Sequence, residues 1–245
     1  MTPTKTKSAP NVPGGNGQFP GQQIPPLENG ANLTVVEFER RYSAMPHIKK
    51  AELINGVVFM PSPVSLDHSG PDSDASIWLG IYRVNTPGTE SAGNSTIKLH
   101  EGENQLQPDD YLRILPEFGG QSGNTVDRYV DGAPELIVEI AVTSAAIDLH
   151  QKLDAYQENG VKEYIVWRVW EQAIDWFILR GGRYDRLAPD ANGIYRSEVF
   201  PGLWLDSAGM IRRDLATVLR VLQQGLASPE HVAFVGQMQA RAPKP

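Results

Sequence analysis

Hydrophobic positions are densest in the second half of the chain, where short apolar runs indicate strands and one amphipathic segment indicates a helix. The run ELIVEIAV, residues 135–142, has the composition of a buried strand. Residues 144–159 then predict a helix, with Ser144 as its N-cap and Asn159-Gly160 as its stop signal. Further strands joined by short turns are predicted over 161–169, 173–180, 182–188 and 193–200.

The first half of the chain shows a similar mixture of elements. Thr34 can cap a helix, and Glu37, three residues later, would complete a capping box. The pair Asn55-Gly56 between two short apolar runs is a strong hairpin signal. Two more strands are predicted, over residues 96–100 and 109–115.

A second helix is predicted in this half, over residues 71–84. Pro71 would lie in its first turn, where its missing N–H costs nothing. The apolar positions Ile77, Ile81 and Val84 would share one face of the helix.

The order of the elements predicts an α/β fold, a mixed β-sheet with flanking helices, because a helix crosses between two strands in a strand-rich chain. Residues 1–32 are rich in Pro, Gly, Gln and Asn and lack hydrophobic periodicity, so we expect a disordered tail there. We expect the folded domain to span residues 33–226, followed by a C-terminal tail over 227–245.

Composition narrows the functional classes. No apolar run is long enough to span a bilayer, and no hydrophobic signal segment begins the chain, so a cytoplasmic protein is the simplest expectation. The absence of cysteine excludes disulfides, thiolate metal ligands and cysteine nucleophiles. The net charge of −7 argues mildly against a protein that coats nucleic acid through a basic surface.

Acidic residues are concentrated between Lys98 and Glu139. This stretch holds nine carboxylates and three basic residues, a local balance of −6. Two interpretations are open: the stretch is a solvated acidic face, or some of its carboxylates gather around a cation.

Glu139 is the exception in its apolar strand. Glu135 could lie at an exposed strand end, but Glu139 stands between Val138 and Ile140. Burial of a carboxylate costs free energy, on the order of 2 kcal/mol or more, unless the carboxylate is paired or bound to metal. The next helix has Lys152 on its packed side. Its ammonium could reach solvent, or it could pair with Glu139, which by itself would explain the glutamate.

The packed side of that helix is defined by Leu149, Leu153 and Tyr156, spaced i, i+4, i+7. Asp109 opens a predicted strand after a proline, where a carboxylate is usually a turn or cap residue. Together with Glu139, however, it would make an oxygen-rich site suited to Mg²⁺. A lysine beside such a site could position a water or stabilise charge on a phosphate.

With these residues in view, the chain resembles the Uma family of putative restriction endonucleases, within the PD-(D/E)xK nuclease superfamily. The resemblance covers about 175 residues, from roughly 34 to 210. It rests on the segments TVVEFERRYSAM, AELINGVVFMPSPVSLDH, QPDD, GAPELIVEIAVTS, DLHQKLDAYQENGVKEYIVW and FPGLWLD.

The resemblance implies a restriction-endonuclease-like core and a set of site residues. Asp109, Glu139 and the backbone carbonyl of Ile140 would bind Mg²⁺, with Mn²⁺ as a possible substitute. The superfamily lysine falls at Ala141 here, and Lys152 from the following helix would replace it. By the same resemblance Glu52 would lie at the site, with an ordinary hairpin carboxylate as the other interpretation, and His68 would contact phosphate or a ligand water, with a local helix cap as the other interpretation. With metal bound, Arg113 could meet the nucleic-acid backbone together with Lys98 and Arg128.

Two departures from the family pattern leave alternatives open. The residue after the motif aspartate is usually apolar, but here it is Asp110, which would become the ligand if the strand register were shifted by one. The turn after the central strand reads AVTSAA, where the family commonly has a serine-proline pair.

The implied function is a Mg²⁺-dependent endonuclease that hydrolyses DNA phosphodiester bonds with a metal-activated water. The acidic chain predicts weak DNA binding by one protomer, so a homodimer is a possible arrangement. The alternative is a catalytically weak or inactive binding or regulatory protein on a nuclease scaffold, because a fold does not fix a function. Action on RNA or another phosphoester is a third hypothesis.

Overall fold

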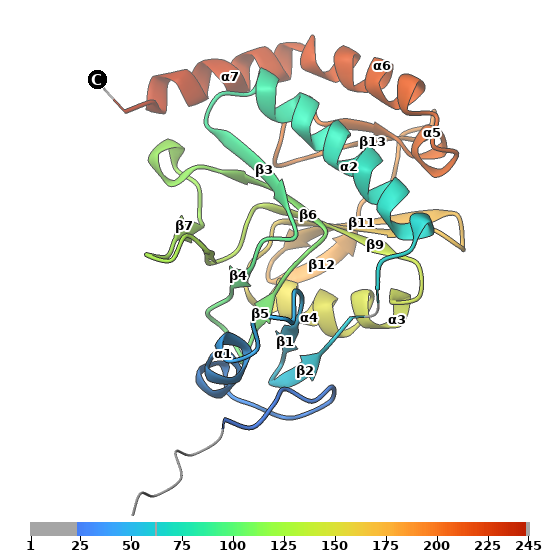
Figure 1. The fold of residues 1–245 in the computed structure, drawn as a ribbon. Coiled ribbons are helices and arrows are strands. Elements are labelled where there is room, and N and C mark those ends of the chain that lie inside the picture. The colour runs from blue at the N-terminus through green and yellow to red at the C-terminus, as the bar shows by residue number, and fades with distance from the viewer. Residues whose placement is uncertain (1–23, 62, 244–245) are drawn as a thin grey trace, which may run out of the picture.

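The computed structural model describes residues 24–61 and 63–243, which form an α/β fold with two six-stranded sheets and flanking helices (Figure 1). The expected α/β class is thus confirmed, although two sheets replace the one expected. The helices are α1 (Val35–Ser43), α2 (Leu66–Asn85), α3 (Ala145–Asp148), α4 (Gln151–Glu158), α5 (Ser207–Ile211), α6 (Leu215–Leu226), α7 (Pro229–Arg241) and the 3₁₀ helix η1 (Pro116–Phe118).

The central sheet has the strand order β12-β11-β10-β9-β6-β3. Its strands are β3 (Thr89–Gly93), β6 (Asp110–Ile114), β9 (Leu136–Ala141), β10 (Glu163–Arg168), β11 (Ala173–Arg180) and β12 (Arg183–Arg186). Strands β9 and β10 pair in parallel, which requires a crossover, and α3 and α4 provide it. The other neighbours pair antiparallel, so the sheet is mixed.

The first sheet has the order β2-β1-β5-β4-β8-β7 and carries the N-terminal hairpin. Its strands are β1 (Glu52–Ile54), β2 (Val57–Phe59), β4 (Ile97–Lys98), β5 (Gln105–Leu106), β7 (Gly123–Asn124) and β8 (Val130–Asp131). The turn residues Asn55 and Gly56 have φ of 49° and 77°, as a tight hairpin requires. Strands β13 (Ile194–Arg196) and β14 (Trp204–Asp206) form a third, two-stranded sheet, and Tyr195 of β13 stacks on Trp176 of β11.

Helices cover both faces of the central sheet, as Figure 1 shows with α2, α6 and α7 above it and α3 and α4 below. The alternation along β9 explains this arrangement, because Leu136, Val138 and Ile140 join the core under α2 and α6. Ile137 and Ala141 join the core under α4. Glu139 therefore points to the α4 side of the sheet.

Helix α2 differs from its prediction in its start and in its buried face. It begins at Leu66 after Ser65, and Pro71 lies inside the helix. The buried stripe includes Trp78 and Tyr82, whose large rings pack onto the central sheet. Ile77 and Val84 are 41% and 66% exposed, so the predicted face was wrong. The inward stripe follows the larger aromatic surface, four residues apart, rather than the branched aliphatics.

The single helix predicted over 144–159 is broken into α3 and α4 at His150. Ser144 makes no capping bond to the backbone of α3, because its hydroxyl donates to Asp148. Lys152 and Tyr156 are buried in α4, whereas Leu149 and Leu153 are only partly buried. The break turns α4 so that the lysine, and not the leucine stripe, faces the sheet most directly.

The chain ends differ from the predicted tails. Most of the expected N-terminal tail, residues 1–23, lies outside the described residues. Residues 24–32 lie along the hairpin: Leu27 is buried and Asn32 bridges to Val57. In place of the C-terminal tail expected over 227–245, residues 229–241 form α7, whose N-cap Ser228 accepts from the His231 N–H. His231 and Met238 are buried on this helix, and Phe234 packs partly buried against the core.

Candidate functional site

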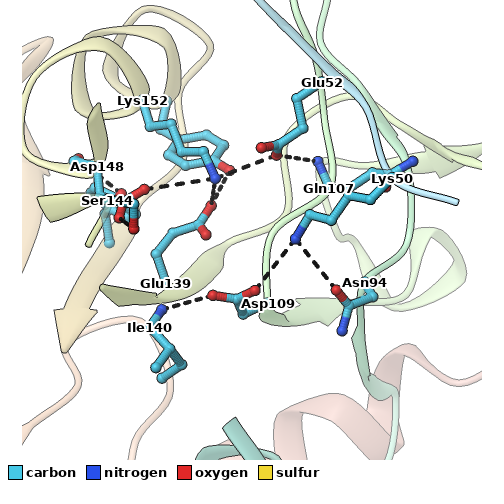
Figure 2. A network of polar contacts seen from close by, with 12 residues as sticks. Lys50, Glu52, Asn94, Gln107, Asp109, Glu139, Ile140, Ser144, Asp148 and Lys152 are labelled. Atoms are coloured by element: carbon cyan, nitrogen blue, oxygen red, sulfur yellow. Dashed lines mark hydrogen bonds and ion pairs between the residues drawn. The ribbon is translucent and has the colours of Figure 1, made fainter. Parts of the chain in front are cut away.

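The candidate site lies where the first sheet meets the central sheet. The chain passes from β5 to β6 through residues 107–109, and the Gln107 N–H donates to Glu52 Oε1 on β1 at 2.8 Å. This bond fixes the end of the first sheet beside Asp109. Figure 2 shows Glu52, Asp109, Glu139 and Lys152 directed toward one another. Glu52 comes from β1, Glu139 from β9 and Lys152 from α4, and Asp109 immediately precedes β6.

Glu139 is 2% exposed and its hydrogen bonds converge on one oxygen. Lys152 Nζ donates to Glu139 Oε1 at 2.9 Å, and the Tyr156 hydroxyl donates to the same atom at 2.8 Å. Within the described residues, Oε2 receives no hydrogen bond. Burial raises the pKa of Glu139, and the Lys152 charge opposes this shift in part.

Lys152 is enclosed by carboxylates. Its Nζ lies 2.9 Å from Glu139, 3.3 Å from Glu52 and 3.7 Å from Asp148, and the residue is 5% exposed. Burial alone would lower the pKa of Lys152, but the facing carboxylates outweigh it and raise the pKa well above its ordinary value. The ammonium therefore stays charged and buried, which excludes the alternative that it reaches solvent. One cation faces three carboxylates, so negative charge is in surplus.

Asp109 is held in place by donors from three elements. The Ile140 N–H donates to Oδ2 at 2.8 Å, and His68 Nε2 on α2 lies 3.2 Å from the same atom. Lys50 Nζ, just before β1, lies 3.4 Å from Oδ1. Burial would raise the pKa of Asp109, but the His68 hydrogen bond and the Lys50 charge outweigh it and hold the pKa at about 2. Asp109 is therefore ionised at neutral pH.

Asp110 lies on the opposite face of β6, toward α2. Its carboxylate accepts from Ser76 Oγ at 2.8 Å. Burial raises the pKa of Asp110 to about 8, with the Ser76 hydrogen bond opposing the shift. Of the two aspartates, Asp109 is therefore the one that lies beside Glu139, which is the register expected if strand alternation holds.

The oxygen donors of the site fit a divalent cation that keeps several waters. Mg²⁺ is typically bound through one or two carboxylates, and Asp109 and Glu139 supply these at adjacent strands. Because the N–H and C=O of a strand residue point to the same edge, the Ile140 carbonyl lies at the edge that faces Asp109. In the described part of the chain, however, no group of three or more His, Asp and Glu side chains is arranged to hold a metal by itself.

The neighbourhood of Asp109 also contains unsatisfied polar atoms. His68 Nδ1 and Asp72 Oδ1, both on α2, are buried without a hydrogen-bond partner among the residues that the structure describes. Buried polar atoms are normally paired, so these two atoms point to a further binding partner at the site, such as an ordered water or an ion.

Arg113, expected to meet the substrate, is instead part of the structure. Its guanidinium is 3% exposed and bonds to Glu90, to the Gly123 carbonyl and to Asn124 Oδ1. A guanidinium with its donors already used and buried has nothing left for a phosphate. Strand alternation in the sequence puts Arg113 on the same face as Asp109. It does not show that residues of β3 and β7 would bind the guanidinium.

Lys50 is the site residue that sequence reasoning missed. Its side chain is 25% exposed, and Nζ lies 3.4 Å from both Asp109 Oδ1 and Asn94 Oδ1. The available signal was its position two residues before Glu52, because in an extended chain residues i and i+2 point to the same side. Lys50 is thus the cation of the site that solvent can reach.

Comparisons with known proteins indicate the family and the fold. A family model described as "Putative restriction endonuclease" (Uma2) matches residues 35–208. A solved structure titled a putative nuclease belonging to DUF820, from Anabaena variabilis ATCC 29413, is similar with a TM-score of 0.53 and 13% sequence identity, over 73% of this chain and 99% of that chain. No curated protein matches the chain. Within the described residues, no helix has the length and apolarity that a membrane crossing requires.

Proposed function

Because the chain belongs to the Uma2 family, described as putative restriction endonucleases, we propose that it is a Mg²⁺-dependent endonuclease that hydrolyses DNA phosphodiester bonds. The observation that carries this proposal is the meeting of Asp109 and Glu139 from adjacent strands beside the buried Lys152. The match to the family and the nuclease fold of the solved neighbour support it.

Asp109 and Glu139, with the Ile140 carbonyl, would hold the metal. When bound, Mg²⁺ lowers the pKa of a water and offsets charge on the phosphate and leaving oxygens. Asp109 is prepared for this role because it is ionised and because the Ile140 N–H and His68 fix its orientation. Glu139 is oriented through Oε1, which leaves Oε2 available as a ligand.

The two lysines divide the remaining work. Lys152 faces three carboxylates and is nearly inaccessible, so we assign it to positioning Glu139 and Glu52 rather than to contact with the phosphate. Lys50 is accessible and lies next to Asp109, so it is placed to meet the negative phosphate. His68, with a side chain 22% exposed, would support Asp109 and contact phosphate when protonated.

Electrostatics sets the expected strength of DNA binding. The chain carries a net charge of −7, so the few cations of one protomer would hold DNA weakly and with strong dependence on salt. A homodimer would double the number of such contacts on one duplex, and we propose it as the active arrangement.

The test is cleavage of plasmid and oligonucleotide DNA with Mg²⁺, with Mn²⁺ and with chelator. We expect cleavage that requires metal, is lost in Asp109→Asn and is weakened in Lys50→Ala. Asp110→Asn is the matched control, because this neighbouring carboxylate faces α2 and its pKa of about 8 leaves it largely neutral already. Equal cleavage by wild type and Asp109→Asn would contradict the proposed site.

A binding or regulatory role on the same scaffold is the second candidate. It is favoured by the lack, among the described residues, of a ready group of three or more metal-holding side chains. Calorimetric titration of Mg²⁺ or Mn²⁺ separates the two candidates. Metal or DNA binding without cleavage under every condition would favour the second.

A further inference from the structure

An open surface pocket of about 500 Å³, called the cavity below, lies beside the candidate site, on the side of the first sheet. It is lined by the end of α1 and the segment after it, by the connection between β3 and β4, and by the turn between β7 and β8. Six of its lining residues carry the argument: Tyr42, Lys49, Asn94, Gln107, Arg128 and Tyr129.

The cavity and the site share a wall. Asn94 lines the cavity, and its Oδ1 lies 3.4 Å from Nζ of Lys50, which also contacts Asp109. Gln107 lines the cavity as well, while its backbone N–H donates to Glu52. Figure 2 shows Asn94 beside Lys50, so a ligand that contacts Asn94 in the cavity would lie close to the lysine proposed to meet the phosphate.

The lining has the chemistry that recognises a nucleotide. Tyr42 and Tyr129 supply rings, and Tyr129 is 42% exposed while Lys98 lies over its ring at 5.4 Å from the centroid. Asn94 is exposed and carries an amide that can pair with the edge of a base. Gln107 is buried, and its amide donates to Thr96 Oγ1 at 3.0 Å and to the Tyr42 hydroxyl at 3.4 Å, so it holds the wall of the cavity in place. Lys49 and Arg128 add positive charge at the same cavity. Unpaired bases are recognised in this way, by aromatic stacking and edge hydrogen bonds beside cations.

We propose that this cavity receives one unstacked base of the DNA strand that is cut, next to the scissile phosphate. The inference rests on the proposed nuclease function and names its substrate class: DNA with an unpaired nucleotide at the cut site. Stacking on an aromatic side chain strengthens binding by about 5- to 150-fold per base. Extraction of a paired base costs a comparable amount, so a bulged or mismatched base is the one that enters.

The experiment measures base capture without cleavage. Duplexes carry the fluorescent base 2-aminopurine, either as a single-nucleotide bulge or in a matched pair, and are titrated with the full chain in chelator and in Ca²⁺. We expect the bulged duplex to bind at least about 10-fold more tightly than the matched one, with a rise in 2-aminopurine fluorescence. Equal affinity for the two duplexes would overturn the inference. An unchanged fluorescence of the bulged duplex would overturn it as well.

Variants separate the cavity from the site. Tyr129→Ala should remove the preference for the bulge, whereas Tyr129→Phe should keep it because the ring remains. Trp170→Ala is the matched control: Trp170 is 65% exposed in the turn between β10 and β11 and does not line the cavity. Circular dichroism checks that each variant is folded. A bulge preference unchanged in Tyr129→Ala would contradict the assignment.

Two further arms distinguish the failures. Free deoxynucleoside monophosphates are added as competitors. If they displace the bulged duplex and bind as tightly as it does, the cavity is a site for free nucleotides instead. Cleavage is scored separately with Mg²⁺. Base capture without any cleavage supports the cavity and contradicts the nuclease, whereas cleavage without base capture contradicts the cavity alone.

Discussion

Two glutamates of the same segment, four residues apart, are both buried and differ in what surrounds them. Glu135 is fully buried, and each of its oxygens accepts from a backbone N–H: Oε2 from Ile114 at 2.8 Å and Oε1 from Gln121 at 3.0 Å. Glu139 accepts instead from an ammonium and a phenol, with other carboxylates nearby. Glu135 fastens one loop to the sheet, whereas Glu139 belongs to a charge surplus.

A third glutamate confirms the distinction. Glu163 on β10 is fully buried, and its carboxylate accepts from Ser197 Oγ and from the backbone N–H groups of Glu198 and Val199. Burial of a carboxylate therefore does not mark a functional site by itself. The informative feature is the donor: neutral backbone donors indicate a structural role, and a lysine shared among several carboxylates indicates a candidate site.

The largest expected effect is on catalysis and comes from substitution of Glu139. Glu139→Gln keeps an oxygen for the two donors at Oε1, so the fold should survive. Cleavage should fall by at least about 100-fold, since loss of outer-shell partners alone costs 10–100-fold in metal affinity or activity. Initial rates of plasmid nicking measure this. Glu135→Gln, assayed as soluble folded protein, should cleave at the wild-type rate, and the reverse ranking would contradict the assignment.

The largest expected effect on stability comes from Lys152→Met. Removal of this cation leaves Glu139, Glu52 and Asp148 buried without their counter-charge. Breaking a buried pair by removing one partner costs about 3–5 kcal/mol in the free energy of unfolding. The loss should be larger at pH 8 than at pH 5, because the carboxylates can take up protons at low pH. Urea unfolding at both pH values tests this, and a loss independent of pH would argue against the pairing.

Glu135→Gln tests the structural half of the comparison. Its two oxygens each serve a different N–H, so either orientation of the amide leaves one N–H facing an NH₂ group. An unsatisfied buried donor costs about 1–3 kcal/mol. Thermal unfolding monitored by circular dichroism should show this loss, and a variant as stable as wild type would mean that the loop is held by other contacts.

The last effect, expected for Glu163→Gln, appears only in the pH dependence of stability. Burial raises the pKa of Glu163 to about 7, from an ordinary value of 4.5, so the folded state binds this proton more tightly than the unfolded state. Its contribution to stability is complete below pH 4.5 and is lost as pH rises through 7. The amide mimics the protonated acid, because Oε1 alone accepts both backbone donors. Between pH 5 and 7 wild type should lose about 2 kcal/mol relative to the variant; parallel curves would contradict this.

Elements with strong local signals could be read from the sequence. The Thr34 cap, whose side chain accepts from the Glu37 N–H, and the Asn55-Gly56 hairpin both appear where local chemistry requires them. The strands after residue 160 follow their apolar runs for the same reason. Glu37 itself pairs with Arg40 and Arg41, so only half of the capping box is formed.

Several features depend on contacts between distant parts of the chain and could not be predicted from the sequence. Glu135 looked like an exposed strand end, and only the path of the loop around Gln121 buries it. The inward face of α2 depends on how Trp78 and Tyr82 meet the sheet. For the site, Asp109, Glu139, Lys152 and Glu52 come together as expected, but Lys50 and the loss of Arg113 to Glu90 depend on contacts between strands far apart in the chain.

The junction of the two sheets also has a consequence for the order of folding. The Glu52 carboxylate reaches Lys152 across it, and the residues that meet there come from four separate stretches of the chain. Contacts between distant stretches must overcome loop-closure entropy before they form, so they come late. We expect a nascent or partly folded chain to hold its hairpin and its crossover helices before it holds this site, and the proposed nuclease activity to require the completely folded chain.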